Sequence, residues 1–288
     1  MIRYIPFLFV VIWSTGWIVA GFAARYADPL WFLFLRFTLA AIAMGLIGLI
    51  MRVTFPRDRR LIGHAMVSGV LIHAVYLAGV WWAVAKGVPS GVSGIMAGLQ
   101  PVMTAMLAPA LLGERISPIR LLGVAFGFFG IVLVLLPKLV GVDPATFDAI
   151  KIPLIVNFIG MVGVTLGTFY QKRFVTSGDL VATTFWQYVA ASLAMLPLVP
   201  LFGAMVAEWN MTLILTMAWS VLVLSIGGIL LFMTVLKHGE VSRATAFIYL
   251  VPPMTALLAF AIFGETLTTA QLGGMAVTAL GVFLATRR

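Results

Sequence analysis

The stretch PVMTAMLAPALLGE, residues Pro101–Glu114, returns later in the chain as PPMTALLAFAIFGE, residues Pro252–Glu265, with nine identities in fourteen positions. The likeness extends beyond these two segments. When Lys86–Leu133 is laid on Lys237–Leu284 at a constant offset of 151, 16 of 48 positions are identical without a gap. Chance would give roughly a tenth of positions in a chain this apolar. The sequence therefore contains an internal duplication, which bears directly on its architecture.

Composition places this duplication in a membrane. Hydrophobic residues make up 62% of the 288 residues and charged residues 9%, against about 45–50% and about 25% in soluble domains. Apolar runs of about 20 residues, long enough to cross a bilayer, recur from end to end. They predict ten spans, at residues 5–24, 30–51, 63–85, 91–112, 118–136, 153–171, 180–202, 211–236, 241–263 and 269–286. We therefore expect an all-α integral membrane protein that is almost entirely embedded in the lipid bilayer.

The ten spans divide into two sets of five. We take residues 1–136 as the first five-helix repeat, 137–152 as the loop between the repeats and 153–288 as the second repeat. Because each repeat has an odd number of spans, equivalent residues such as Glu114 and Glu265 are expected on opposite sides of the bilayer. Such an inverted repeat is typical of carriers that work by alternating access, although some channels share it.

Lysine and arginine residues predict the orientation. If the N-terminus is cytoplasmic, thirteen of them fall on the cytoplasmic side and four on the other, with Arg36 left inside a span. This bias places both termini in the cytoplasm. The net charge of +9 is dispersed through the loops, so it does not indicate a nucleic-acid-binding module.

These features resemble the drug/metabolite transporter superfamily, EamA branch. The resemblance rests on the ten spans, the duplication, the Pro-to-Gly-Glu signature that ends the fourth and ninth spans, and the opening segment WSTGW, Trp13–Trp17. That opening and the adjacent pair Trp81 and Trp82 are most similar to the bacterial exporters of aromatic and other neutral amino acids, the YddG type. The resemblance implies an exporter in the bacterial inner membrane. Exporters of nucleosides, drugs and other metabolites share the general signature.

The Pro-to-Gly-Glu signature also has a structural interpretation of its own. Glycine can end a helix with a positive φ, and Ser117 and Thr268 can begin the next helix as N-caps. The two glutamates then lie beside a helix N-terminus, where the helix dipole favours an anion. Prolines inside spans kink helices and free backbone carbonyls. We therefore assign to structural turns and kinks Pro101, Gly113, Glu114, Pro252, Gly264 and Glu265.

Polar and aromatic residues at membrane depth are the candidates for a substrate site. Arg36 would be costly against lipid, so it faces protein, water or a substrate carboxylate, or snorkels to the near end of its span. His73 and Tyr76 are three residues apart and share one helix face, and Tyr188 adds a further polar tip. The candidates for lining a cavity are Trp17, Arg36, His73, Tyr76, Trp82, Gln100, Asn157, Tyr170, Trp186, Gln187 and Tyr249. Aromatic residues at span ends are counted mainly as interface anchors, and these are Trp13, Trp31, Trp81 and Trp209.

An amino-acid substrate needs partners for a carboxylate, an ammonium and a side chain. Polar side chains and helix N-termini suit the carboxylate, carbonyls near kinked prolines suit the ammonium, and aromatic residues can form a wall for the side chain. We therefore expect an exporter of aromatic and other neutral amino acids and related small metabolites, with nucleoside export as an alternative.

The acidic residues bear on coupling. All nine fall in predicted loops or at helix ends, so the spans offer no conventional proton relay or sodium site. His73 is the one deep group that titrates near neutral pH, and the sequence has no phosphate-binding loop for ATP. Gradient-driven export is therefore preferred, and a drug/metabolite:proton antiporter that works through His73 is the alternative.

An intramembrane enzyme is the competing class. The segment GVSG, Gly91–Gly94, matches the short pattern around the nucleophile of rhomboid proteases, but the histidine that follows it, His238, is expected at a helix end. The sequence has no cysteine and no paired acid and base, so we expect no catalytic centre and no thiolate metal site. No cofactor and no obligate protein partner are expected. The expected partners are the lipid bilayer and a small-molecule substrate.

Overall fold

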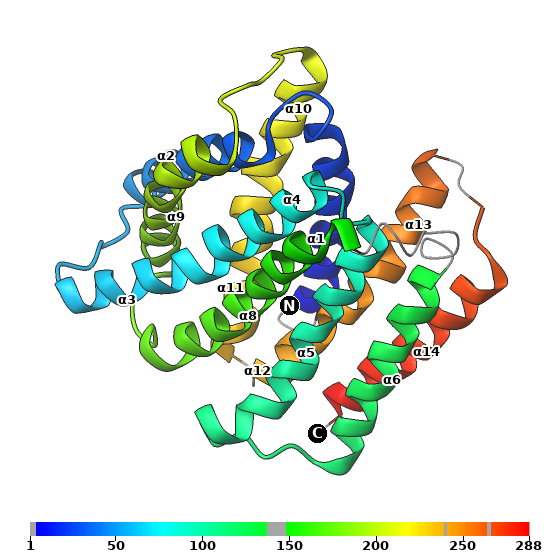
Figure 1. Ribbon diagram of the computed structural model, residues 1–288. Coiled ribbons are helices and arrows are strands. Elements are labelled where there is room, and N and C mark those ends of the chain that lie inside the picture. The colour runs from blue at the N-terminus through cyan, green and yellow to red at the C-terminus, as the bar shows by residue number, and fades with distance from the viewer. Residues whose placement is uncertain (1–3, 137–147, 239–240, 264–265, 288) are drawn as a thin grey trace.

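Helices form almost all of the protein in the computed structural model, which describes residues 4–136, 148–238, 241–263 and 266–287 (Figure 1). Their bounds in chain order are α1 (Ile5–Ala23), α2 (Pro29–Ile50), α3 (Arg59–Gly69), η2 (Val70–Val75), α4 (Tyr76–Ala85), α5 (Ser90–Leu112), α6 (Pro118–Leu135), α8 (Lys151–Phe174), α9 (Leu180–Phe202), α10 (Met211–Trp219), η4 (Ser220–Gly228), α11 (Ile229–His238), α12 (Val241–Ala246), η5 (Phe247–Leu250), α13 (Val251–Phe263) and α14 (Thr269–Thr286).

These helices confirm the expected membrane fold. Within the described residues, nine continuous helical stretches are long and apolar enough to cross a membrane, with α3, η2 and α4 forming one of them and α10, η4 and α11 another. The remaining expected span, residues 241–263, is built from the shorter pieces α12, η5 and α13. The described residues therefore form an all-α membrane protein with nine membrane-length helices and a tenth, segmented one.

Side-chain caps fix where several spans begin. The carboxylates of Asp28, Asp58 and Asp179 accept backbone N–H groups at the starts of α2, α3 and α9. Asn210 does the same at the start of α10, and Thr268 forms a capping box at the start of α14. Such caps satisfy N–H groups that have no partner within the helix. These acidic residues therefore lie at helix ends because they hold the ends in place.

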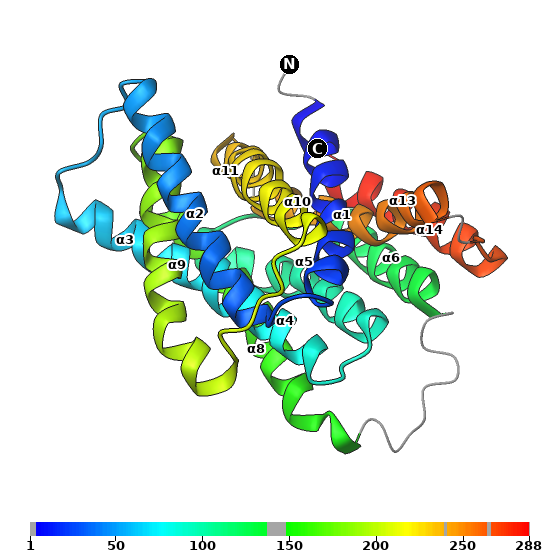
Figure 2. The same ribbon diagram turned by 90° about the horizontal axis from the view of Figure 1, so that it is seen from above.

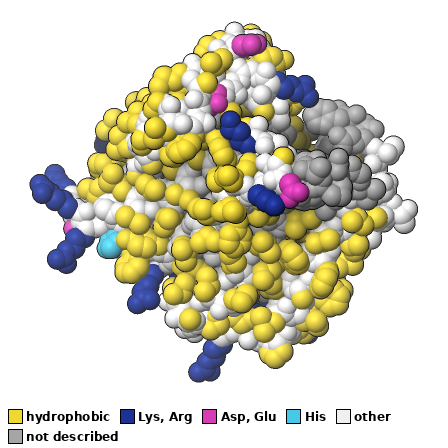
Figure 3. All heavy atoms as spheres, in the orientation of Figure 1, with side chains coloured by type: hydrophobic (Ala, Val, Ile, Leu, Met, Phe, Trp, Pro, Cys, Tyr) yellow, Lys and Arg dark blue, Asp and Glu magenta, His cyan; other side chains and the backbone are white. Residues whose placement is uncertain are grey.

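The outer surface carries large apolar side chains. Leu49, Met106 and Leu201 are among those that are exposed. Figure 3 shows hydrophobic side chains over most of the visible face, with lysine and arginine side chains at its left and lower edges and a few more on its upper half. A soluble protein rarely exposes a continuous apolar surface of this extent. It is the surface expected of a helical bundle whose sides face lipid.

The fifth spans of the two repeats, α6 and α14, lie side by side at one edge of the bundle, away from α2, α3 and α9 (Figures 1 and 2). A Cβ atom added to Gly123 would lie 2.7 Å from the carbonyl oxygen of Gly281, and one added to Gly274 would lie 2.8 Å from that of Gly130. With the offset of 151, residues 123 and 130 of the first repeat are equivalent to residues 274 and 281 of the second. The contact of Gly123 with Gly281 and the contact of Gly274 with Gly130 are therefore equivalent to each other. Reciprocal contacts between antiparallel helices are what an inverted repeat with a pseudo-two-fold axis requires.

The third span of each repeat is interrupted by a π-helical segment. In the first repeat this segment is η2, and in the second it is η4. The offset of 151 carries residues 70–75 onto 221–226, which lie inside η4. π-Helical turns are rare and frequently lie at functional sites. The two segments therefore mark a matched pair of places at which to look for a transport site.

Glycines let the sixth span pack closely against the third. A Cβ atom on Gly79 would lie 2.9 Å from the carbonyl oxygen of Val156, and one on Gly160 would lie 3.0 Å from that of Tyr76. Such approach of two helix backbones is typical of small residues at membrane interfaces. It brings α8 against η2 and α4 over much of their length.

Glu114 connects the two repeats. Gly113 ends α5 with φ of 69°, and the carboxylate of Glu114 then accepts hydrogen bonds from Val241 N at 2.7 Å, Ser242 N at 3.3 Å and Ser242 Oγ at 2.6 Å. The helix N-terminus that it meets is therefore the start of the ninth span, in the other repeat. The equivalent pair, Gly264 and Glu265, lies outside the described residues.

We predict that Glu114→Gln mainly lowers stability. The amide keeps an acceptor oxygen but loses the charge and one acceptor at the start of α12, which should reduce the free energy of unfolding by about 1–2 kcal/mol. Thermal unfolding followed by circular dichroism tests this, with Glu208→Gln as the control because Glu208 is an exposed loop residue. A Glu114→Gln protein that is as stable as the wild type but does not transport would contradict the structural role.

Candidate functional site

The spans alternate in direction, which defines two ends of the bundle. We call the basic end the one that holds the start of α3 and the ends of α8 and α11, with Arg59, Lys172 and Lys237. The opposite end holds the starts of α2 and α8 and the end of α9. The candidate site lies between the two ends.

A cavity of about 60 Å³ lies among α1, α2, α4 and η4, in the half of the bundle towards the opposite end. It has room for a few water molecules but not for an amino acid. Trp13, Trp17 and Trp81 in its lining are only partly buried, so the cavity is small but not sealed. The lining residues are Trp13, Gly16, Trp17, Ala20, Arg36, Tyr76, Leu77, Val80, Trp81 and Leu224.

Arg36 supplies the charge in this cavity. The residue is only 6% exposed, so its guanidinium does not snorkel to the membrane interface. Its Nε donates a hydrogen bond to Ser225 Oγ at 2.8 Å, in the π-helical segment η4. Its two terminal nitrogens make no hydrogen bond to any described residue, while the side chain lines the cavity. A planar guanidinium held by one nitrogen presents the others as a fork that fits a carboxylate.

The rings of Tyr188 and His73 lie next to Ser225 in the middle of the bundle. The hydroxyl of Tyr188 donates to the carbonyl oxygen of Ser225 at 2.6 Å. The ring of His73, in η2, stacks on the ring of Tyr188 with centroids 4.5 Å apart, and Phe37 packs beside both rings. His73 Nε2 and Gln187 Oε1 are buried, and neither atom has a hydrogen-bond partner by distance and angle among the described residues.

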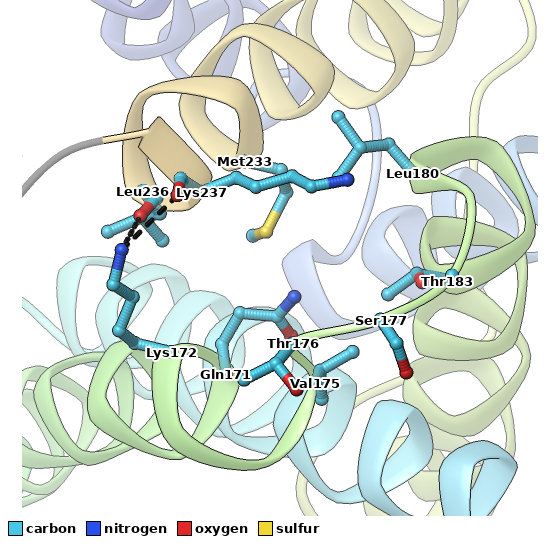
Figure 4. A pocket seen from close by; sticks show the side chains of 11 residues that line it. Gln171, Lys172, Val175, Thr176, Ser177, Leu180, Thr183, Met233, Leu236 and Lys237 are labelled. Carbon is cyan, nitrogen blue, oxygen red and sulfur yellow. Dashed lines mark hydrogen bonds between the residues drawn. The ribbon is translucent and has the colours of Figure 1, made fainter.

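Three polar side chains carry the contacts on towards the basic end. Gln187 Nε2 donates to Ser68 Oγ at 3.0 Å and to Gln171 Oε1 at 2.9 Å, and Ser68 Oγ donates to the same oxygen at 2.8 Å. Gln171 in turn lines a second pocket, of about 110 Å³, at the basic end (Figure 4). We call the polar column the set Gln171, Ser68, Gln187, His73, Tyr188, Ser225 and Arg36. It joins the two pockets through the middle of the bundle.

The tryptophan candidates are distributed differently from the expectation. Trp17 lines the cavity, as do Trp13 and Trp81, which the sequence placed at the interface. Trp82 does not line this cavity, because its Nε1 points to the end of α9 and donates to Phe202 O at 3.2 Å. Successive residues of a helix point about 100° apart, so only one of an adjacent pair can face inwards here.

The other candidates serve contacts away from the two pockets. The hydroxyl of Tyr170 is 2.7 Å from His64 Nδ1, and Asn157 Nδ2 donates to Ser93 Oγ at 2.8 Å. The ring of Tyr249 occupies the space against Gly127 in the core between α5, α6 and α14. None of the three lines the cavity at Arg36 or the pocket at Gln171, and each contributes to helix packing.

Gln100 and Trp186 have a different status. Both carry a buried side-chain nitrogen that has no hydrogen-bond partner in the described part of the chain, Gln100 in α5 and Trp186 in α9. Neither lines the cavity at Arg36 or the pocket at Gln171. Pro101 lies inside α5, and Pro252 lies in the first turn of α13.

Three members of the polar column were not among the sequence candidates. They are Ser68, Gln171 and Ser225. Serine is common in membrane helices, where its hydroxyl usually bonds the preceding turn of its own helix. The available signal was the duplication itself, since Ser225 lies next to Leu224, the equivalent of His73. No group of three or more possible metal ligands occurs among the described residues.

Comparison with known proteins decides the class of this molecule. A model of the EamA-like transporter family matches residues 4–136 and again residues 151–287. The chain belongs to the EamA-like transporter family. The two matches correspond to the duplicated halves, and membership makes the chain a multi-pass membrane transporter rather than an enzyme.

Several relatives match over nearly the whole length. A "Probable amino-acid metabolite efflux pump" of Escherichia coli is 24% identical, covering 96% of this chain and 92% of its own. An uncharacterized transporter of Archaeoglobus fulgidus is 21% identical, covering 98% and 97%. An uncharacterized inner membrane transporter of Escherichia coli, YedA, is 24% identical, covering 97% and 89%. The EamA fold is shared by a solved crystal structure with a TM-score of 0.83 at 19% identity, covering 99% of this chain and 96% of the other.

Proposed function

We propose that this EamA-like transporter exports amino acids, aromatic and other neutral ones, and related small metabolites from bacterial cells. It works by alternating access down the substrate gradient, in the inner membrane, with the basic end and both termini in the cytoplasm. The two units that move are the repeats 1–136 and 153–288.

The observation that carries this proposal is the placement of Arg36. A buried guanidinium with free donors is costly unless an anion pairs with it, and a carboxylate fits its fork. Trp13, Trp17 and Trp81 surround the same cavity, and their faces suit the apolar or aromatic part of a substrate and its ammonium group. The Escherichia coli relative is named as a probable amino-acid metabolite efflux pump, which points to the same substrate class.

The inverted repeat supports the mechanism. In such a transporter each half can adopt the conformation of the other, so exchange of the two converts an outward-open state into an inward-open state. The small cavity at Arg36 and the closely packed polar column fit a state without an open path through the bundle. Lysine and arginine at the basic end support its cytoplasmic location.

Flux into proteoliposomes of purified protein tests the substrate class. We expect saturable uptake of phenylalanine, leucine or a similar amino acid, with little change when a pH gradient is imposed. Uptake of nucleosides or drugs without uptake or competition by any amino acid would overturn the substrate assignment. Unsaturable flux at high conductance would overturn the carrier.

The alternative is proton antiport, and one observation favours it. His73 is 2% exposed, and its Nε2 lacks a hydrogen-bond partner within the described residues. A histidine in such a position could take up a proton as the column rearranges. Uptake of substrate that requires a pH gradient would support this alternative over gradient-driven export.

We predict that His73→Ala reduces transport while membrane insertion stays normal. Loss of the imidazole removes the ring that stacks on Tyr188 and leaves a cavity in the middle of the column, and we expect an uptake rate about tenfold lower. His64→Ala is the matched control, because His64 lies in α3 but contacts Tyr170 and Phe174 outside the column. Unchanged uptake by His73→Ala at every pH between about 5 and 8 would remove His73 from both binding and coupling.

A further inference from the structure

The pocket at the basic end has a buried floor and an exposed rim. It lies among α8, α9 and α11 (Figure 4). Gln171, Thr183 and Met233 are buried at its floor, whereas Ser177 and Lys237 are exposed at its rim. At about 110 Å³ it holds several water molecules, which is enough for a carboxylate and the carbon that bears it.

The side-chain –NH₂ group of Gln171 points into this pocket (Figure 4). Its Oε1 accepts hydrogen bonds from Ser68 Oγ and Gln187 Nε2, both in the polar column. An amide whose oxygen is held in this way must direct its –NH₂ group the other way. Figure 4 shows the nitrogen of Gln171 pointing away from that oxygen and into the pocket, on the side of Met233.

Lys237 places a positive charge over the same space. Its ammonium reaches across the pocket towards Leu180 in Figure 4, and it donates no hydrogen bond to any described residue. Lys172 has a different role, since its Nζ donates to the carbonyl oxygens of Leu236 at 2.7 Å and Lys237 at 3.3 Å and so holds the last turn of α11. The ammonium of Lys237 is thus the charge that remains available to a ligand.

Among the described residues that line the pocket, none is acidic and could compensate this ammonium. The carboxylate of Asp179, next in sequence to the lining residues Gly178 and Leu180, accepts from Val181 N at 2.7 Å at the start of α9. Thr183 and Ser177 add hydroxyl groups to the lining. An ammonium, an amide –NH₂ group and two hydroxyls without an acidic partner favour an anion.

We propose that this pocket is a loading site that binds the carboxylate of a small substrate at the basic end, before the substrate reaches Arg36. The assignment of that carboxylate to an amino acid rests on the proposed function. Gln171 belongs both to this pocket and to the polar column. A carboxylate that accepts a hydrogen bond from its –NH₂ group therefore contacts the end of the column directly. The substrate then passes from Lys237 to Arg36, one cation at each end of the column.

The experiment places a single thiol at the rim. The chain has no cysteine, so Ser177→Cys creates the only thiol, and its labelling by a neutral maleimide reports on this pocket alone. The probe is 3-phenylpropionate, which has the carboxylate and ring of phenylalanine but no ammonium, with protein in nanodiscs of neutral phosphatidylcholine. We expect the probe to slow labelling, and Lys237→Gln in this background to raise the half-protecting concentration about tenfold. Arg57→Gln, which removes an exposed charge from the loop before α3, is the matched control and should change nothing.

Three results would overturn the loading site. They are equal protection by phenethylamine, which lacks the carboxylate, a half-protecting concentration that Lys237→Gln leaves unchanged, and the absence of protection by 3-phenylpropionate. Protection by phosphatidylglycerol nanodiscs alone, lost in Lys237→Gln, would assign the pocket to a lipid phosphate and overturn the substrate site. If the protein transports amino acids but 3-phenylpropionate does not slow labelling, the loading site is wrong and the proposed function stands. If 3-phenylpropionate slows labelling in a way that depends on Lys237 but no amino acid is transported, the amino-acid substrate is wrong and the anion site stands.

Discussion

Arg36→Gln should abolish transport while leaving a folded protein in the membrane. The glutamine can still bond Ser225 in η4, but it lacks the charge and the fork that would hold a carboxylate in the cavity. Removing one partner of a buried charge pair typically costs 2–5 kcal/mol, so we expect kcat/KM to fall by at least about thirtyfold. Initial rates of amino-acid uptake, normalised to reconstituted protein, are the measurement.

Two further variants make the test of Arg36 specific. Arg36→Lys keeps the charge but cannot bond Ser225 and a carboxylate at once, so we expect about a tenfold loss. Arg25→Gln removes an exposed arginine that lies over the Phe22 ring near the opposite end, and should have little effect. Wild-type uptake by Arg36→Gln would show that the cavity at Arg36 is not the substrate site.

Gly274→Leu should prevent the two repeats from assembling. A Cβ atom at this position would lie 2.7 Å from Val134 N and 2.8 Å from Gly130 O, both backbone atoms of α6 that cannot turn aside. Overpacking of this kind typically costs 1–3 kcal/mol and occasionally more, and a leucine against rigid backbone belongs at the upper end, about 3 kcal/mol. The yield of monodisperse protein in size-exclusion chromatography and its melting temperature are the measurements.

The neighbouring glycine provides the matched control. Gly273 has no atom within 4 Å of an added Cβ, so Gly273→Leu places the same side chain one residue away on the exposed side of α14. We expect it to leave yield and melting temperature close to those of the wild type. Equal behaviour of the two variants would mean that the contact between α6 and α14 does not hold the repeats together.

The reach of sequence reasoning differs between the fold and the site. Spans follow from the length of apolar runs, and inversion follows from an odd number of spans per repeat, so both could be predicted. The reciprocal contacts of Gly123 with Gly281 and of Gly274 with Gly130 show that the offset of 151 is a spatial symmetry as well as a sequence one. Hydrophobicity and parity are coarse properties that many local packing arrangements would satisfy.

The site needed details that periodicity does not contain. Arg36, His73 and Gln187 were candidates because charged and amide groups are costly at membrane depth. Which of Trp81 and Trp82 faces the cavity depends on the rotation of α4, and the π-helical segment η2 directly before it shifts that rotation. Ser225 contributes to the site because η4 brings its hydroxyl to Arg36, although a serine by itself gives no such signal.

Symmetry and chemistry separate in this protein. The two π-helical segments are matched, yet His73 corresponds to Leu224, and Arg36 corresponds to Gln187. The repeats thus supply similar frames for motion, while unlike residues at equivalent positions supply the groups that would contact a substrate. Both Arg36 and Gln187 belong to the polar column, so the two repeats contribute different side chains to the column from equivalent positions.

Counterflow tests the central claim most directly. Proteoliposomes loaded with unlabelled phenylalanine are diluted into trace labelled phenylalanine, and the label inside is followed with time. Alternating access at Arg36 predicts a transient accumulation of label above its equilibrium level, abolished by Arg36→Gln and retained by Arg25→Gln. A simple approach to equilibrium without accumulation, at a rate unchanged by internal phenylalanine, would contradict a carrier with a single site exposed to one side at a time.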